Sequence, residues 1–417
     1  MYKDPMTHTE YRRIRSIRIM FFLAGLSNFF RLQVNVQVIP IEIIAVVISL
    51  FSLVLSKSQH LTTNDNQLLR FLNSFCAITV LNQVIVDRVQ NVFFPETLKS
   101  IAQAIVLWGL LRVALIYIKP DILRFISYSA GYFLSILVQY IIDPTPYMQI
   151  DPWKFAFGPA ITGLVFLLYK SNKFLVGKSL LLIFLVLVST YLGSRSLALF
   201  TVLALIITIR KVSIRKTTLA GGIGIGLVFL TLLFGFERLY YQLSTSGTLG
   251  LSQQLKALDQ YRAGPILIAG RSELAFQISA ISQNPILGNG SNPELTTQML
   301  NDAQKINSFL GVKTENTNAY KATLLNGRVP QHSMLFSAWV EGGVVSVAFW
   351  VIIFAWAVRK FVAVPNNHSP LGDFTTFVGL STLWAIVFSP LGAGSRMDLA
   401  IGLVALLLHS KNGHNAH

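Results

Sequence analysis

Charged residues are scarce in this sequence. They make up 12% of its 417 residues, whereas hydrophobic residues make up 53%. A soluble globular domain usually carries about 25% charged residues, so the composition excludes an ordinary water-soluble fold. Apolar runs of roughly 18–22 residues recur along the chain, and this length crosses a bilayer as a helix. Together with a mean hydropathy of +0.57, these runs predict an all-α, polytopic helical membrane protein.

Motifs that bind common cofactors are also missing. The chain has one cysteine, Cys76, so the sequence predicts neither a disulfide framework nor a cysteine-based metal site. It has no phosphate-binding Walker loop, no dinucleotide-binding glycine pattern and no HExxH zinc motif. We therefore expect no cofactor and no bound metal.

Acidic residues are about half as common as basic ones. There are 18 Asp and Glu against 34 Lys and Arg, which gives a formal net charge of +16. In a soluble protein this excess would suggest nucleic acid, but here the basic residues cluster in short links between apolar runs. Such links mark the cytoplasmic side of a membrane protein and can also meet anionic lipid headgroups. The bilayer is therefore an expected partner, and nucleic acid is not.

The apolar runs predict about twelve membrane-spanning helices. Their approximate ranges are 17–32, 37–56, 68–87, 97–118, 122–142, 154–169, 175–191, 196–209, 217–236, 333–357, 373–389 and 397–409. A basic N-terminus in the cytoplasm fixes the direction of the first span, and the basic turn at 210–216 then also falls inside the cell. The same count puts both termini inside.

The predicted spans divide the chain into three parts. Residues 1–236 form a bundle of about nine spans, residues 237–331 form one large loop on the outer side, and residues 332–417 add about three spans. We expect the loop to be ordered, because SQQLKALDQYRA (252–263) and PILIAGRSELAFQISAISQ (265–283) have helix-like apolar spacing. The second helix should lie at the interface or pack on the bundle. It should end at Asn284-Pro285, before a turn at Gly288-Asn289-Gly290.

Two arginines are candidates for binding an anion. Arg195 lies in a Gly-Ser-Arg-Ser turn between two apolar spans. An arginine at that depth is costly unless it is paired or faces water, which favours a function, although it could also snorkel from a helix end. Arg271 lies in the apolar part of the second loop helix, and Glu273 is too close in sequence to face it. Its role could be functional or structural.

His332 comes directly before the tenth span, where the polar loop meets the membrane helix. Histidine at such a boundary is a candidate acid or base, or else a surface residue next to a helix cap. Ser333 can cap the helix. Glu341, about two turns further on, could orient a polar network, bind a proton or pack beside the glycines that follow it. Arg396 is a weaker candidate, since it could simply pair with Asp398.

These residue types indicate a reaction at phosphate. The predicted topology puts Arg195, His332 and Arg396 on the outer side. Arginine side chains bind phosphate oxygens in pairs, and a leaving phosphate needs its developing charge stabilised. The residues therefore predict a metal-independent transfer from a lipid diphosphate to a hydroxyl acceptor, with His332 removing the acceptor proton.

Three segments carry a resemblance to a known family. GSRSLALFTVLAL (193–205), RSELAFQISAISQNPILGNGS (271–291) and QHSMLFSAWVEGGVVSVAFW (331–350) resemble, in this order, the O-antigen ligase / Wzy O-antigen polymerase superfamily. The resemblance covers roughly residues 175–410. It implies a bacterial inner-membrane glycosyltransferase of the GT-C type, with about 12 transmembrane helices and one large, partly helical periplasmic loop. Members take a glycan from undecaprenyl diphosphate.

The resemblance also implies roles for single residues. Arg195 and Arg271 would contact the donor diphosphate, with Arg396 as a weaker candidate for the same cationic pocket. His332 would be the catalytic base, and Glu341 and Ser333 would support it. Ligases often carry His-Asn where this chain has His332-Ser333, which favours a polymerase of O-antigen or exopolysaccharide repeat units.

The competing hypotheses differ in the acceptor or in the class of protein. A ligase would transfer the glycan to lipid A-core, whereas a polymerase would use another glycan and could need a chain-length regulator. A lipid-linked sugar flippase or another carrier would also fit twelve spans and cationic residues. Against a carrier, the sequence shows no repetition between its halves and no matching Gly- or Pro-broken helices.

Overall fold

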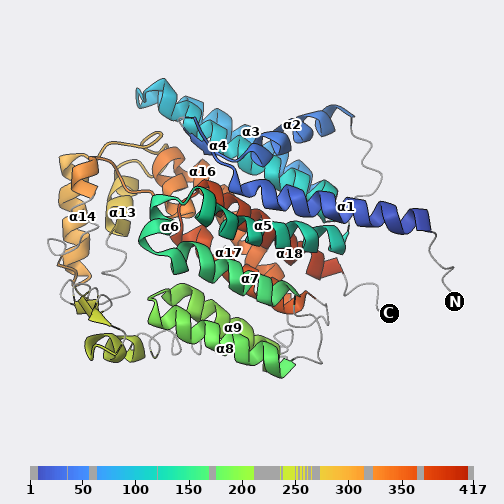
Figure 1. Ribbon diagram of the computed structural model, residues 1–417. Helices are drawn as coiled ribbons and strands as arrows, with labels where there is room; N and C mark the ends of the chain where they lie inside the picture. The colour runs from blue at the N-terminus through green and yellow to red at the C-terminus, as the bar shows by residue number, and fades with distance from the viewer. Residues whose placement is uncertain are drawn as a thin grey trace.

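The computed structural model shows a mostly helical molecule (Figure 1). It describes residues 8–34, 36–55, 63–119, 121–168, 175–210, 273–313, 323–363 and 371–411, together with scattered residues between 235 and 264. The one sheet in the described part is a two-stranded antiparallel hairpin of β1 (Leu32–Val34) and β2 (Val36–Val38). The prediction of a helical fold is confirmed.

The helices before the long loop follow one another with short connections. They are α1 (His8–Leu26), α2 (Pro40–Leu55), α3 (Thr63–Val89), α4 (Phe94–Val113), α5 (Ile122–Ile142), α6 (Pro146–Ile150), α7 (Gly158–Leu168), α8 (Leu175–Tyr191) and α9 (Arg195–Arg210). Two π-helical segments, η2 (Ala114–Ile118) and η3 (Trp153–Phe157), continue α4 and precede α7. The later helices are α13 (Glu273–Gln283), α14 (Thr297–Phe309), α16 (Met334–Ala363), α17 (Gly372–Phe388) and α18 (Ala393–Lys411).

Helices coincide with all the predicted spans except 217–236, nearly all of which lies outside the described residues. Among the described residues, four helical stretches are long and apolar enough to cross a membrane: Asn66–Val89, Phe94–Ile118, Ile122–Ile142 and Met334–Val362. Five further apolar helices are shorter. The apolar helices indicate a membrane protein, and the total of twelve spans stays a prediction.

The first predicted span, 17–32, is wrong at its C-terminal end. Helix α1 stops at Leu26, followed by the 3-10 turn η1 (Ser27–Phe29) and the hairpin. Ser27 Oγ donates to Ala24 O at 2.8 Å and Asn28 Nδ2 to Gly25 O at 2.6 Å. Short polar side chains that bond to nearby backbone carbonyls in this way compete with the helix. The valines of the next segment then favour strands.

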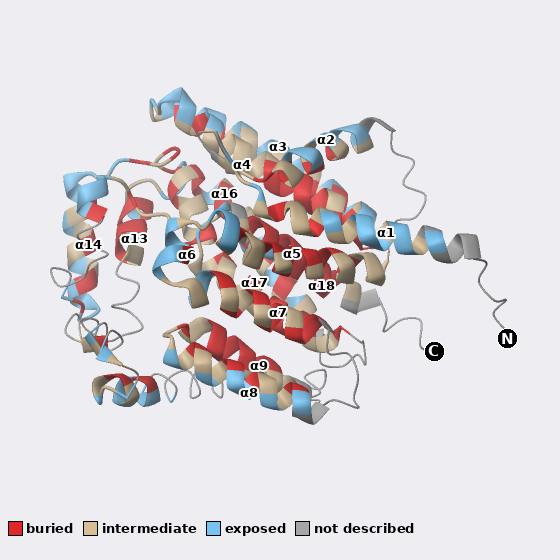
Figure 2. Ribbon diagram, in the orientation of Figure 1, coloured by how far each residue is buried: buried red, intermediate tan, exposed pale blue. Residues whose placement is uncertain are grey.

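The core lies among the central helices, whereas the outer helices carry exposed apolar faces (Figure 2). Phe125, Phe374, Ile386 and Leu406 are fully buried on α5, α17 and α18. Large exposed apolar side chains cover one face each of α2, α3 and α8, among them Ile44, Leu50, Phe51, Ile78, Leu81, Leu180, Phe184 and Leu187. Exposed apolar surface on this scale suits contact with lipid.

The two ends of the bundle differ. Figure 1 places α13 and α14, from the long loop, at the end opposite the N- and C-termini. At the other end Lys178, near the start of α8, pairs with Asp373, at the start of α17. The predicted topology likewise puts both of these helix starts on one side of the membrane and the loop on the other. Which of the two sides is the cytoplasm stays a prediction.

The described part of the long loop is ordered, as the sequence predicts. Helix α13 ends at Gln283, directly before Asn284-Pro285, as expected. It packs on α16 through Gln277, whose Nε2 donates to Ser337 Oγ at 3.1 Å. Ser279 Oγ donates to Met299 O in α14 at 2.9 Å. The predicted helix at 252–263 lies largely outside the described residues.

Candidate functional site

Helix α16 is interrupted near its start. Gly343 has φ 63° and ψ −155°, a backbone conformation that only glycine adopts readily. The 20 residues from 344 to 363 that follow span about 30 Å as a helix, which matches the hydrocarbon thickness of a bilayer. The segment Met334–Gly342 is therefore a separate helical piece at the loop end. Glu341 lies at the break instead of two turns inside a continuous span.

The segment 284–292, here called the docking loop, fills this break. Asn289 N donates to Val340 O at 2.7 Å, and Gly290 N donates to Glu341 O at 3.0 Å. On the far side of the break, Val344 N donates to Ile286 O at 3.1 Å. The docking loop thus supplies hydrogen-bond partners for the backbone N–H and C=O groups that the interruption leaves unpaired. Unpaired backbone groups are costly in a membrane, so an interrupted helix needs such partners.

Glycines make this close approach possible. Gly288 and Gly290 have φ values of 87° and 83°, which side-chain-bearing residues rarely adopt. A Cβ on Gly288 would lie 2.5 Å from Glu341 O, and a Cβ on Gly343 would overlap Ile286 O. The turn itself comes earlier than predicted, at 285–287, where Gly288 N donates to Asn284 O at 2.9 Å. The predicted turn residues Gly288-Asn289-Gly290 follow it and contact α16.

The docking loop is fastened to the end of α3 by a buried carboxylate. Asp87 Oδ1 accepts from Ser291 N at 2.7 Å, and Asp87 Oδ2 accepts from Ser291 Oγ at 2.6 Å. Gln83 Nε2 donates to Asp87 Oδ1 and to Ser291 Oγ, both at 3.0 Å. Gln90 Nε2 donates to Gly288 O at 3.0 Å. Charge-assisted bonds such as those of Asp87 are about twice as strong as neutral ones, so they hold the loop firmly.

Glu341 joins the docking loop, α4 and the approach to α16. Its Oε1 accepts from Asn292 N at 3.1 Å and from the side-chain amide of Gln331. Its Oε2 accepts from Ser100 Oγ, on α4, at 3.4 Å. Lys99 is close enough to interact electrostatically with the carboxylate. The expectation that Glu341 organises a polar network matches this geometry.

His332 stands directly outside this network. Its side chain is 47% exposed, and its Nε2 lies 4.0 Å from Oε1 of Glu273, the first residue of α13. Ser333 is buried, and its Oγ accepts from Phe336 N at 3.1 Å, so it caps α16 as predicted. The cap fixes the backbone next to His332, and the imidazole remains open to a reactant.

A cavity of 320 Å³ opens beside Glu341 between α3, α4 and α16. Gln331, Ser100 and Lys99 line its loop end together with Glu341. The approach to α18, residues 390–392, borders the same cavity. The network around Glu341 thus forms the polar end of an internal space.

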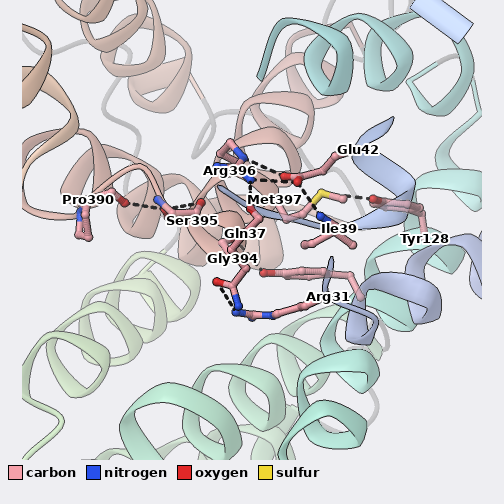
Figure 3. Close-up of polar contacts among 12 residues, drawn as sticks. Arg31, Gln37, Ile39, Glu42, Tyr128, Pro390, Gly394, Ser395, Arg396 and Met397 are labelled. Carbon is pink, nitrogen blue, oxygen red and sulfur yellow. Dashed lines mark hydrogen bonds and ion pairs between the residues drawn. The ribbon is translucent and has the colours of Figure 1, made fainter. Parts of the chain in front are cut away.

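Arg396 lies elsewhere, in a buried ion pair with Glu42 at the start of α2 (Figure 3). Its Nε and Nη2 donate to Glu42 Oε1 and Oε2 at 2.8 and 2.9 Å, and Nη2 also donates to Gln37 O at 3.0 Å. The suggested pair with Asp398 is wrong, because Asp398 accepts from Tyr132 Oη at 2.8 Å. Only 1% of Arg396 is exposed, so its charge is neutralised and covered. This geometry does not offer the guanidinium to a diphosphate.

The two other arginines are placed differently. Arg195 begins α9, and its guanidinium lies 4.9 Å from the ring centre of Tyr240, near the start of the long loop. A cation over an aromatic face is attracted to it. Arg271 lies outside the described residues. The predicted meeting of Arg195, Arg271 and His332 therefore stays a prediction.

Several residues of the site were not singled out from the sequence. Arg328 Nη1 donates to Asn292 O at 2.9 Å and lies 3.7 Å from Glu96 Oε1. Asp87 is the residue that a sequence argument could have found, because a carboxylate inside an apolar span is a functional candidate by default. No pattern in the neighbouring sequence indicates a role for Gln331 or Ser100. Their shared partner, Glu341, lies 10 positions from Gln331 and 241 positions from Ser100.

In comparisons with known proteins, no family model matches the chain and no curated protein matches it. Within the part of the chain that the structure describes, no three His, Cys, Asp or Glu side chains come together as a group that could hold a metal ion.

Proposed function

We propose that this chain is a bacterial inner-membrane glycosyltransferase that moves a glycan from undecaprenyl diphosphate to a sugar hydroxyl on the periplasmic side. Within that class, we propose a polymerase of O-antigen or exopolysaccharide repeat units. The three segments around Arg195, Arg271 and His332 motivate the family, and His332-Ser333 motivates the choice of polymerase. Twelve spans, two cytoplasmic termini and a periplasmic loop at 237–331 belong to this proposal.

The exposed imidazole of His332 beside Glu273 carries the proposal. A carboxylate near one ring nitrogen orients the imidazole, and the other nitrogen is then placed to accept a proton. The 4.0 Å separation is longer than a hydrogen bond, and such contacts often tighten when substrate binds. Gln331, the residue directly before His332, lines the polar end of the cavity.

The reaction needs one base and a stabilised leaving group. The acceptor hydroxyl oxygen attacks the anomeric carbon of the donor sugar and loses its proton to His332. The bond from that carbon to the diphosphate oxygen breaks, and its electron pair stays on the lipid diphosphate. Arg195 and Arg271 are proposed to stabilise the departing charge. Arg396 is left out of this role, because Glu42 already neutralises it.

The test is transfer by purified protein in liposomes supplied with undecaprenyl-diphosphate repeat units. A ladder of growing products from the donor alone is expected, both with and without EDTA. Transfer only onto added lipid A-core would replace the polymerase by a ligase. Movement of the lipid across the vesicle wall without transfer would overturn the glycosyltransferase in favour of a carrier. Loss of activity in EDTA that a divalent ion restores would overturn the metal-independent mechanism.

A further inference from the structure

The lining of the cavity beside Glu341 changes from polar to apolar along its length. Most of its polar side chains gather at the loop end, namely Gln83, Lys99, Ser100, Gln103, Gln331, Ser337 and Glu341, where Met334, Ala338 and Leu391 also line it. Further along α3, α4 and α16 it consists mainly of apolar and aromatic ones: Leu72, Phe75, Leu107, Trp108, Leu111, Phe349 and Trp350. From Lys99 to Leu111 the helix rises about 18 Å. The cavity is therefore long, and its polarity is graded along the bundle axis.

The second described cavity lacks this gradient. A second cavity of 450 Å³ lies among α1, α2, α4, α5 and α18, and its lining is almost wholly apolar, from Ile44 and Ile48 to Val404. In the first cavity, by contrast, the polar end carries one cation, Lys99, among the described lining residues. Trp108 gives its indole N–H to Asn73 Oδ1 at 2.9 Å, so no polar group of this side chain needs a partner in the cavity.

We infer that this cavity holds the first isoprenoid units of a lipid diphosphate, with Lys99 facing the phosphates at the polar end. An amphipathic slot with a cation at its mouth matches a single hydrocarbon chain that ends in an anion. Its 320 Å³ is at the small end of ligand pockets, which measure about 300–1,000 Å³, so it takes only the part of the chain next to the headgroup. The inference rests on the proposed function, whose donor is such a lipid.

The placement also brings the reacting carbon to the site. The phosphates of a lipid seated in this way lie at the level of Lys99, Ser100 and Gln331, and Gln331 is the immediate neighbour of His332. The sugar on the diphosphate then extends toward the loop side, where His332 is exposed. Lys99 lies near the carboxylate of Glu341, which Asn292, Gln331 and Ser100 also engage. Unlike Arg396, which is buried in a pair with Glu42, Lys99 lines the cavity.

The experiment measures binding of two probes to purified protein: undecaprenyl diphosphate without a glycan, and undecaprenol, which has the same chain and no charge. Ala104→Phe fills the graded cavity from α4. Ala114→Phe makes the same substitution in the other cavity, from the continuation of the same helix. We expect Ala104→Phe to lower the affinity of the protein for both probes by about tenfold or more. The phenyl ring would displace several methylene groups of the lipid chain that are otherwise buried in the cavity. Ala114→Phe should leave both affinities within about twofold.

Lys99→Gln distinguishes binding of the diphosphate headgroup from binding of the isoprenoid chain. This substitution should lower the affinity for undecaprenyl diphosphate by about tenfold, which is typical of losing a charged hydrogen bond. The affinity for undecaprenol should not change. Lys305→Gln, on the exposed face of α14, is the matched control. Excess phosphatidylglycerol should not displace the probe if the site selects an isoprenoid diphosphate over an ordinary anionic lipid, and displacement would overturn that selectivity.

The outcomes distinguish the two proposals. If the parent protein binds undecaprenyl diphosphate and all four variants bind it equally, the cavity assignment is overturned and the glycosyltransferase stands. If the parent protein does not bind this lipid at all, the donor of the proposed function is wrong. A variant that loses its thermal transition is replaced by Ala104→Leu, which fills less of the same cavity.

Discussion

The proposed base, His332, and the carboxylate beside it, Glu273, lie on two different segments of the chain. His332 leads into α16, and Glu273 opens α13, so the geometry of the pair depends on α13 packing against α16. Because 47% of the His332 side chain is exposed, its removal leaves no buried hole. The residue should matter for chemistry far more than for folding.

We expect His332→Ala to lower glycan transfer by about 100-fold or more, since a general base contributes roughly 10²–10⁴-fold. Arg271→Ala should also abolish transfer, because the departing diphosphate loses a stabilising charge. Both variants should insert and melt like the parent protein, which a thermal-shift measurement on the purified protein checks. Lys305→Ala, exposed on α14, is the control that should keep full activity. Normal polymer from either His332→Ala or Arg271→Ala would remove that residue from the mechanism.

Substitutions at Arg396, in contrast to those at His332, should affect the stability of the fold. Removing one partner of a buried ion pair costs about 3–5 kcal/mol, because the other charge is left unpaired. Arg396→Met and Glu42→Leu should therefore each lower the thermal midpoint and the yield of folded protein. The double variant should lie closer to the parent than either single one. If Arg396→Met melts like the parent and loses only lipid binding, Arg396 is a diphosphate ligand after all.

At the scale of elements, α16 and the docking loop act as one unit. The loop supplies the hydrogen-bond partners that the break at Gly343 would otherwise leave empty, and Asp87 of α3 holds the loop in place. Three segments from distant parts of the sequence thus fix the position of Glu341. An interrupted helix is costly at a membrane unless such partners exist.

Gly343→Ala tests this unit. Gly343 has φ 63° and ψ −155°, and this conformation costs a residue with a side chain about 1–3 kcal/mol. The Cβ of the alanine would also overlap Ile286 O. We expect the docking loop to detach, seen as faster backbone hydrogen exchange at 284–292 and lost transfer. Gly177→Ala, on α8, meets no atom within 4 Å and should change neither. Unchanged exchange in Gly343→Ala would mean that the loop does not depend on the break.

The sequence predicted those elements whose cause is local. Apolar runs predicted the helices, Asn284-Pro285 predicted the end of α13, and Ser333 predicted the cap of α16. It could not predict the break at Gly343, because the break is stable only through backbone contacts with residues of the docking loop. Nor could it pair Arg396 with Glu42, which is 354 positions away, while Asp398 lies two residues along the chain. Local pattern therefore predicts where helices lie, and long-range contacts decide which charges are free.

At the scale of the whole molecule, the position of the ends sets the direction of the chemistry. The long loop lies at one end of the bundle and both termini at the other (Figure 1). The Glu341 network, the docking loop and His332 all belong to the loop end. If that end faces the periplasm, the glycan is transferred outside the cell, where nucleotide-linked donors are absent and a lipid-linked donor is required.

Single cysteines test this direction. Cys76 is the one cysteine of the chain, so a Cys76→Ala background removes the native thiol. Lys305→Cys on α14 should react with a membrane-impermeant maleimide in intact spheroplasts. Arg124→Cys, at the start of α5 on the opposite end, should react only after the membrane is opened. The reverse pattern would place His332 in the cytoplasm and contradict the proposed periplasmic reaction.

The contact between Asp87 and Ser291 also sets an order for biosynthesis. The two residues are 204 positions apart, so α3 enters the membrane long before the ribosome has made the docking loop. During that interval the carboxylate of Asp87 has no partner from the loop. Helix α16 follows the docking loop along the chain, so the residues that fill its break are made before it. A nascent chain that stops before residue 284 therefore leaves Asp87 without its partner from the docking loop.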